Sequence, residues 1–270
     1  MGVDLNAVVT RIERVAPGLM ILQVAPDGWE LPDFKPGQFA VIGLPGSAPR
    51  CPEANGEEQP PAPDKLLRRS YSIASSSRQK EYLELYVALV RSGGLSPRLF
   101  ALREGDRLWL SPKVSGLFTL DQVPADANLV LVATGTGLAP YVSMLRSRLL
   151  EESTRRVAVI HGARHSWDLG YRDELTAMQR TFPHLAYIPV VSRPDEEVSP
   201  WPGFAGRVQD AWRGGEVARQ WGFPPHPDHT HILLCGNPEM VEVMTALLES
   251  EGYRQHTRSS PGHIHTEKYW

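Results

Sequence analysis

The chain has 270 residues, 41% of them hydrophobic and 22% charged, a length that suits one large domain or two of ordinary size. No apolar run approaches the length of a bilayer span and no secretory signal is readable at the start of the chain, so we expect a cytoplasmic protein without a membrane segment. The net charge is −3, with acidic and basic side chains intermixed, which argues against a nucleic-acid-binding surface.

The cysteine and histidine content limits metal chemistry. Two cysteines, Cys51 and Cys235, are too few for a disulfide framework or a four-cysteine zinc or iron–sulfur site, so any iron–sulfur centre must lie in a partner. Several histidines gather near the C-terminus, but no carboxylate or cysteine completes a recognisable ligand pattern, and we predict no metal site. These histidines are His226, His229, His231, His263 and His265.

The first part of the chain is predicted as short strands between turns, because β-branched, aromatic and leucine residues recur there between Gly, Pro and Asp. The expected strands cover residues 8–15, 18–25, 39–44, 69–75, 83–90 and 106–111. Regularly spaced strands without intervening helices favour a small antiparallel barrel. The segment from Pro45 to Lys65 is dense in Pro, Gly, Glu and Ala, and we expect a mobile surface loop there.

From Asn128 onward, apolar strands alternate with helical stretches. The expected strands cover residues 128–134, 156–162, 186–191 and 231–236, and the expected helices 141–150, 171–182 and 238–252. This alternation predicts a doubly wound parallel sheet, with a second loop from Pro194 to Gly206. We therefore expect two domains, an antiparallel β-barrel over residues 1–122 and an α/β domain over residues 123–270.

Two features of the barrel half suggest an anion site. Arg69 and Tyr71 alternate with Ser70 and Ser72 on a predicted strand, although a strand with Tyr toward the core and Arg toward solvent would look the same. About twenty residues downstream, the segment Gly93–Phe100 combines two glycines, a serine expected at an N-cap and a proline in the first helical turn; such a start can bind an anion, although any capped helix shares that geometry. Together, the two could hold a pyrophosphate.

A glycine turn opens the α/β half. The strand Leu129–Thr134 runs into Gly135-Thr136-Gly137-Leu138-Ala139-Pro140 and then a helix, which is where a nucleotide phosphate binds in parallel sheets. The third glycine of the usual pattern is replaced by Pro140, which suits a first helical turn. The context favours nucleotide binding over a merely structural turn.

Arginines follow the next two strands. Arg164 and Arg193 stand at strand ends that carry no acidic residue, whereas an NAD site would place an Asp or Glu at the end of the second strand. This pattern favours a 2′-phosphate and therefore NADP, with Arg207 closing the same pocket. Each arginine taken alone also fits a solvated surface residue.

The last apolar strand and the tail carry weaker signals. Cys235 ends a parallel strand, where ligands bind in such sheets, although a buried core thiol fits equally well. The chain finishes with Tyr269 and Trp270, which would stack on a planar cofactor or dock in an ordinary apolar groove.

Five ordered motifs together resemble the ferredoxin–NADP reductase family, bacterial type: Arg-x-Tyr-Ser, Gly-Leu-Ser-Pro, Gly-Thr-Gly-Leu-Ala-Pro, Cys-Gly-Asn-Pro and a terminal Glu-x-Tyr-Trp. The resemblance spans nearly the whole chain. It implies FAD in the barrel, NADP(H) in the α/β domain and ferredoxin or flavodoxin as partner, and we expect a monomer. The Pro45–Lys65 loop is longer than the turn expected from the resemblance, and the barrel half shows no strong basic platform for an acidic ferredoxin; Arg50, Lys65 and Arg68 are candidates.

The resemblance implies a role for each site residue on the flavin side. Arg69 and the Gly94–Ser96 amides would hold the FAD pyrophosphate, Tyr71 would stack on one face of the isoalloxazine and Ser72 would bond near its N5. Tyr269 would cover the opposite face and move aside for the nicotinamide, while Trp270 would stack on a folded-back adenine. The full implied set is Arg69, Ser70, Tyr71, Ser72, Tyr86, Val87, Ala88, Leu89, Gly94, Leu95, Ser96, Tyr269 and Trp270.

On the nicotinamide side, the implied NADP residues are Thr136, Gly137, Ala163, Arg164, Ser192, Arg193 and Arg207. Cys235 and Glu267 would border the position of hydride transfer, so the implied catalytic set is Ser72, Cys235, Glu267 and Tyr269. The expected activity is electron exchange between NADPH and a one-electron carrier, ferredoxin or flavodoxin. An NAD(P)H-dependent flavin reductase component that serves an oxygenase, and a flavoprotein subunit without turnover, are the alternatives.

Overall fold

The computed structural model describes residues 4–149 and 155–268. By their contacts these residues form two compact units. Unit 1 holds the chain up to Thr119 together with Ala139–Ser147, and unit 2 holds Leu120–Leu138 and the chain from Arg148 onward. The sequence pattern gives no sign that Ala139–Ser147 packs with the first unit. None of the helices in the described residues has both the length and the apolar composition of a membrane span.

Unit 1 is built on one six-stranded antiparallel sheet with the order β4-β3-β6-β1-β2-β5. An antiparallel bridge between Ile73 and Leu85 joins the two edges, so the sheet closes into the predicted barrel. The strands are β1 (Ala7–Ala16), β2 (Leu19–Pro26), β3 (Phe39–Pro45), β4 (Leu66–Ser72), β5 (Leu83–Ala88) and β6 (Arg107–Ser115).

One short helix, α1 (Ser96–Leu99), packs on the barrel core through the side chains of Leu95 and Leu99. The long loop, residues 46–65, lies beside it: the N–H of Cys51 donates to the carbonyl of Pro97 at 2.9 Å, and the Cys51 side chain is buried in the barrel core. The expectation of a mobile surface loop is therefore wrong for the first half of this segment.

The segment Ala139–Ser147 of unit 1 comprises α2 (Ala139–Met144) and the first part of a π-helical stretch, Leu145–Leu149. It is tied to the end of the barrel by polar bonds. Ser143 Oγ donates to the carbonyl of Ser75 at 2.7 Å, and Arg146 Nη1 lies 2.7 Å from Glu84 Oε1. Since Glu84 is almost fully buried on β5, this ion pair is shielded from water.

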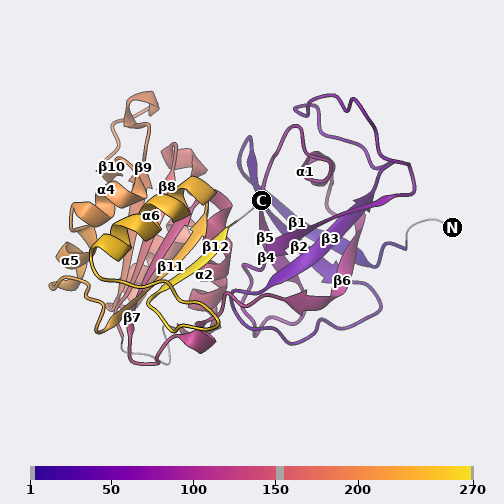
Figure 1. Cartoon of the computed structure of the whole chain (residues 1–270). Coiled ribbons are helices and arrows are strands. Elements are labelled where there is room, and N and C mark those ends of the chain that lie inside the picture. Colours follow the sequence, from indigo (N-terminus) through magenta and orange to yellow (C-terminus); the bar gives the residue numbers. More distant parts are fainter. Residues whose placement is uncertain (1–3, 150–154, 269–270) are drawn as a thin grey trace. The chain divides into compact units, whose positions relative to one another are not determined.

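Unit 2 contains the predicted doubly wound parallel sheet, with the order β10-β9-β8-β7-β11-β12 and every pair parallel. Helices α4 and α6 lie across one face of this sheet (Figure 1). The strands are β7 (Asn128–Thr134), β8 (Val157–Ala163), β9 (Leu185–Val191), β10 (Phe204–Ala205), β11 (Thr230–Gly236) and β12 (Ile264–Lys268). The helices are α3 (Arg172–Thr181), α4 (Val208–Arg213), α5 (Glu216–Trp221) and α6 (Pro238–Ser250).

The strand order reverses between β7 and β11. From β7 the chain winds outward through β8, β9 and β10, and then returns to the other side of β7 as β11 and β12. Ligands of open α/β sheets bind outside the carboxyl ends of the strands at such a switch point. The predicted glycine turn follows β7 at this place. The sequence analysis missed two short strands, β10 inside the predicted Pro194–Gly206 loop and β12 near the C-terminus.

Candidate functional site

The glycine turn before α1 carries unused hydrogen-bond donors. Within the described residues, no hydrogen bond uses the backbone N–H groups of Gly94, Leu95 and Ser96. Leu95 is the N-cap of α1, so the prediction of a Ser96 cap is wrong. The Ser96 hydroxyl is held instead by the backbone of Val90, whose N–H donates to it at 3.0 Å. Three consecutive free N–H groups form an arrangement that binds anions.

Two arginines hold the carbonyl groups of the same turn. Arg50 Nη1 donates to the carbonyl of Gly93 at 3.0 Å, and Arg98 Nη1 donates to that of Gly94 at 2.7 Å. Both guanidinium groups also bind the carboxylate of Glu57, at distances of 2.7 to 2.9 Å. We expected Arg50 as a candidate docking residue, but its side chain is turned inward and only 16% exposed. Neither Glu57 nor Arg98 stands out in the sequence, because they meet only in the folded chain.

Strand β4 passes this turn and orients the Arg-x-Tyr-Ser side chains as alternation requires. A Cβ placed on Gly94 would lie 3.7 Å from Cδ1 of Leu67, which shares its face of the strand with Arg69 and Tyr71. Arg69 is exposed and Tyr71 half-buried. Burial raises the pKa of Tyr71 to about 12, and the Arg69 guanidinium opposes that shift, as expected for neighbouring groups.

The serines of the same motif differ in environment, since Ser70 is exposed and Ser72 is buried at the end of β4. On β5, the side chains of Tyr86 and Val87 are buried, while Ala88 and the following Leu89 are half-buried. Val87 belongs to the barrel core and therefore offers a ligand only its backbone.

The second glycine turn is Gly135–Leu138, a 3-10 turn that leads from β7 into α2. A Cβ on Gly137 would come within 2.7 Å of the Gly236 α-carbon at the end of β11. Gly236 itself has a φ of +133°, and a Cβ there would overlap the Thr134 side chain. Both glycines are therefore required by close backbone approach. Thr136, at the tip of the turn, is partly exposed.

The predicted arginines of unit 2 lie on adjacent strand ends. The N–H of Ser192 donates to the carbonyl of Ala163 at 3.0 Å, and the N–H of Arg193 to that of Arg164, also at 3.0 Å. Both arginine side chains are exposed. Arg207 is the exposed N-cap of α4 and lies two residues after the end of β10, which pairs with β9. The fold thus places Arg164, Arg193 and Arg207 beyond the carboxyl ends of neighbouring strands of the sheet.

A carboxylate that the sequence analysis missed lies among these arginines. A 3-10 turn after β9 brings Glu196 to within 3.3 Å of Arg193 Nη1 and 2.7 Å of His165 Nε2. The hydrogen bond to Glu196 raises the pKa of His165, and the same bond lowers that of Glu196. The His165 ring stacks on Trp167, with 4.5 Å between ring centroids. The ends of β8 and β9 carry no acidic residue, as the sequence indicated, but the turn that follows β9 carries Glu196.

A cavity of about 270 Å³ lies beside these loops in unit 2. Its walls include Trp167 from the loop after β8 and Trp201 from the segment after β9, and the Arg172 guanidinium lies 4.9 Å from the centroid of the Trp201 ring. The charged lining residues are Arg172 and Glu197, and the two indole rings offer faces on which a flat ring system can stack.

Cys235 and Glu267 are register partners on β11 and β12, with Sγ and Oε2 4.0 Å apart. Cys235 is fully buried, as expected of a core thiol, and it stands near the carboxyl end of β11, where ligands bind in parallel sheets. The two predicted stacking residues, Tyr269 and Trp270, lie outside the described residues.

The C-terminal histidines form a stacked cluster. His231 Nδ1 lies 3.1 Å from His265 Nε2, and the ring of His256 stacks on that of His265. Burial lowers the pKa of His231 to about 4 and that of His265 to about 3. Among the described residues, no group of three His, Cys, Asp or Glu side chains is arranged as a metal site.

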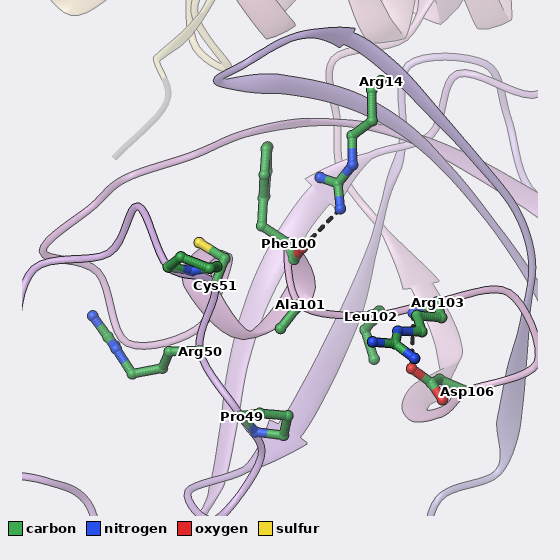
Figure 2. A pocket seen from close by; sticks show the side chains of 10 residues that line it. Arg14, Pro49, Arg50, Cys51, Phe100, Ala101, Leu102, Arg103 and Asp106 are labelled. Atoms are coloured by element: carbon green, nitrogen blue, oxygen red, sulfur yellow. Dashed lines mark hydrogen bonds between the residues drawn. The ribbon is translucent and has the colours of Figure 1, made fainter.

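A larger cavity, of about 610 Å³, lies in unit 1 between the start of the long loop and the end of α1 (Figure 2). None of the predicted flavin residues lines it. Arg14 donates to the carbonyl of Phe100 at 2.7 Å, Asp106 lies beside Arg103, and Arg50 extends away from both of these arginines. Of the three arginines, Arg14 and Arg50 are engaged in hydrogen bonds through their guanidinium groups, and Arg103 has the Asp106 carboxylate beside it; we assign this cavity no ligand.

The chain combines a closed barrel, in which three consecutive backbone N–H groups bind no described residue, with a parallel sheet whose glycine turn lies at the switch point. This combination fits a dinucleotide-dependent oxidoreductase. Residues 131–246 match the family model of the oxidoreductase NAD-binding domain. The chain is 33% identical over 265 residues to the flavodoxin/ferredoxin–NADP reductase of Escherichia coli (strain K12), covering 97% of both. The chain belongs to the bacterial-type ferredoxin/flavodoxin–NADP reductase family.

Solved structures agree with the fold. A ferredoxin NADP+ reductase from Neisseria gonorrhoeae, described with bound FAD and NADP, superimposes with a TM-score of 0.80 at 23% identity over 97% of both chains. The cytochrome P450 reductase of Amycolatopsis gives a TM-score of 0.72 at 26% identity, covering 98% of this chain and 69% of that one.

Proposed function

We propose that this protein is an FAD-dependent reductase that exchanges electrons between NADPH and a one-electron carrier, ferredoxin or flavodoxin. The observation that carries the flavin half is the row of free N–H groups at Gly94, Leu95 and Ser96, because three consecutive unbonded backbone donors suit a pyrophosphate. The activity is further supported by the flavodoxin/ferredoxin–NADP reductase of Escherichia coli, which this chain matches over nearly its full length.

The residues of the barrel unit fit FAD. Arg69 and the Gly94–Ser96 amides would hold the pyrophosphate, Tyr71 would stack on the isoalloxazine ring and Ser72 would bond near its N5. Tyr86–Leu89 would border the ring and the ribityl chain, while Tyr269 and Trp270 would stack on the flavin and the adenine. Bound FAD supplies the chemistry of accepting a hydride and releasing electrons singly.

The residues of unit 2 fit NADP(H). Thr136 and Gly137 would border the phosphates at the switch point, and Arg164, Arg193 and Arg207 would surround the 2′-phosphate together with the backbone of Ala163 and Ser192. The cavity lined by Trp167, Trp201 and Arg172 offers two indole rings on which an adenine base could stack. Because Glu196 already pairs with Arg193, a 2′-phosphate must compete with that carboxylate for the guanidinium.

Cys235 and Glu267 would border the nicotinamide. In this role the buried thiol supplies an uncharged wall, and the Glu267 carboxylate lies 4.0 Å from its sulfur. We further propose a cytoplasmic monomer that binds FAD on the barrel unit and NADP on unit 2.

A reductase component that serves an oxygenase is the second candidate, and the likeness to a cytochrome P450 reductase supports it. The two candidates share the FAD and nicotinamide chemistry and differ in the protein that accepts the electrons. Steady-state reduction of purified ferredoxins and flavodoxins by the holoenzyme separates them. The first proposal is contradicted if the enzyme reduces an oxygenase component rapidly and reduces neither ferredoxin nor flavodoxin.

The same assay tests the choice of NADPH. Replacing Arg164 with Gln removes one cation from the proposed 2′-phosphate site, and we expect the KM for NADPH to rise about tenfold, because one charge-assisted hydrogen bond is lost. The KM for NADH should not change. Arg180→Gln, which removes an exposed arginine at the end of α3, is the control. A wild-type enzyme that uses NADH as well as NADPH contradicts the arginine argument.

A further inference from the structure

The long loop delivers one carboxylate into the barrel unit. Glu57 accepts two hydrogen bonds from Arg98, at 2.8 Å from Nη1 and 2.9 Å from Nη2, and one from Arg50 at 2.7 Å. The Arg98 side chain is only 3% exposed and that of Glu57 only 18%. We call Arg50, Glu57 and Arg98 the arginine clamp.

The arginine clamp spans the base of the loop and the glycine turn. Arg98 Nη2 donates to the carbonyl of Gly46, where the loop begins, at 2.7 Å. Arg50 Nη2 donates to the carbonyls of Asn55 and Arg91 at 2.8 and 3.2 Å. The loop is therefore fastened to the turn by charged groups rather than by apolar packing of its second half.

The same guanidinium groups determine where the free amides of the turn point. In a trans peptide the C=O and N–H groups point in opposite directions. Arg50 holds the carbonyl of Gly93, so the N–H of Gly94 faces away from the clamp; Arg98 holds the carbonyl of Gly94, so the N–H of Leu95 does the same. Both amides are among the three that bind no other described residue.

The charges of the clamp favour an anion in front of the turn. Two guanidinium groups and one carboxylate leave a net charge of about +1 directly behind the amides, in a partly buried region where water screens it weakly. The hydrogen bonds from Arg98 hold the pKa of Glu57 below its usual value, so its charge persists at neutral pH.

We propose that Glu57 is a positioning residue for the flavin: through Arg50 and Arg98 it locks the Gly93 and Gly94 carbonyls, and so fixes the amides that receive the FAD pyrophosphate. This inference rests on the proposed function, because it takes FAD as the anion. Without the carboxylate, the two arginines repel each other and lose their common anchor, and the peptide planes of the turn are no longer held.

The test compares Glu57→Gln with Glu58→Gln, which removes the neighbouring exposed carboxylate outside the clamp. The apoproteins are titrated with FAD, and the flavin-saturated proteins are examined by ³¹P NMR of the bound pyrophosphate. We expect Glu57→Gln to raise the dissociation constant of FAD at least about tenfold and to shift the pyrophosphate resonances, because charge-assisted hydrogen bonds are lost. Glu58→Gln should behave as the wild type.

A purely structural role would lower the unfolding temperature of the apoprotein without moving the pyrophosphate resonances of the saturated protein. Equal FAD affinities and equal ³¹P spectra in the two variants would overturn the proposal.

Arg50→Lys gives an independent measurement if Glu57→Gln does not fold. Lysine keeps the charge beside Glu57 but has one nitrogen, which cannot reach the carbonyls of Gly93, Asn55 and Arg91 at once. We expect a smaller loss of FAD affinity in the same direction, and wild-type affinity would overturn the proposal. A wild-type protein that takes up no FAD refutes the proposed function itself, whereas uptake unaffected by these variants refutes only the role of the clamp.

Discussion

The glycine turn before α1 and the glycine turn after β7 are held in place by different interactions. In the proposed function, each turn presents backbone amides to a phosphate group of a cofactor. In unit 1 the turn at Gly93 and Gly94 is fixed by Arg50 and Arg98, which grip its carbonyls, and a Cβ on Gly94 would meet only one methyl group at an ordinary contact distance. In unit 2 the turn at Gly137 is fixed by direct contact with the backbone of β11.

The two turns need glycine for different reasons. Gly137 is needed for the fold itself, since no side chain fits between the turn and β11. Gly94 is needed at most for a ligand, because the protein leaves room for a methyl group there. Charged side chains hold the turn at Gly94, and steric contact holds the turn at Gly137. Substitution of Gly137 should therefore lower stability, whereas substitution of Gly94 should weaken ligand binding.

The largest effect is expected for Gly137→Ala. The added methyl group must displace the end of β11, and we expect the free energy of unfolding to fall by about 3 kcal/mol, as for an overpacked core position. Urea denaturation measures it. Gly135→Ala, in the same turn, is the control: nothing lies within 4 Å of its Cβ, and only its positive φ of +54° opposes the change, at a cost of about 1 kcal/mol. Equal losses in both variants would contradict the steric account.

A pH-dependent effect of intermediate size distinguishes the two units. All nine histidines lie between residues 161 and 265, in unit 2. Burial lowers the pKa of His161 to about 3 from an ordinary value of 6.5, so the native state stays neutral while the unfolded chain takes up a proton. Its contribution to stability is complete above pH 6.5 and is lost as the pH falls toward 3. His165, whose pKa is raised by Glu196, opposes this trend.

Urea denaturation at several pH values between about 6.5 and 4.5 measures this slope. We expect His161→Gln to reduce the pH dependence of the unfolding free energy by about one proton, roughly 1.4 kcal/mol per pH unit. Glu57→Gln should leave the slope in this window unchanged, because its lowered pKa makes the carboxylate contribute above 4.5 and lose that contribution only below it. An unchanged slope in His161→Gln would show that the imidazole is not held neutral.

The smallest effect on stability is expected for Gly94→Ala, within about 0.5 kcal/mol of the wild type, because the new methyl group meets only Cδ1 of Leu67 at 3.7 Å. The same methyl group stands beside the free amides and should weaken FAD binding. Thermal unfolding of the apoprotein and titration with FAD give the two quantities. A loss of stability as large as that of Gly137→Ala would remove the distinction between the turns.

The sequence predicts the features that depend on local pattern. Strand alternation, the helix–strand succession after Asn128 and the glycine turn after β7 are all written in neighbouring residues, and the two-domain fold follows from them. The pattern also predicts that Arg164 and Arg193 follow neighbouring strands, and the structure brings their backbones together.

What the sequence does not predict depends on partners far apart in the chain. Glu57 and Arg98 are 41 residues apart, and nothing in the composition of the long loop indicates that one of its glutamates is buried. The Ser96 cap was mispredicted because its hydroxyl had a competing partner in the backbone of Val90. The short strand β12 has too few residues for a pattern, and it is stabilised by pairing with β11.

The buried Arg98 restricts how the long loop can be shortened. A deletion that removes Glu57 also removes the counter-ion of a guanidinium that is only 3% exposed, and an uncompensated buried charge costs about 3 to 5 kcal/mol. A trimmed protein therefore needs an uncharged residue of similar volume at Arg98 as well. Natural homologues that lack the segment face the same constraint, so loop length and the identity of this one helical residue should vary together across the family.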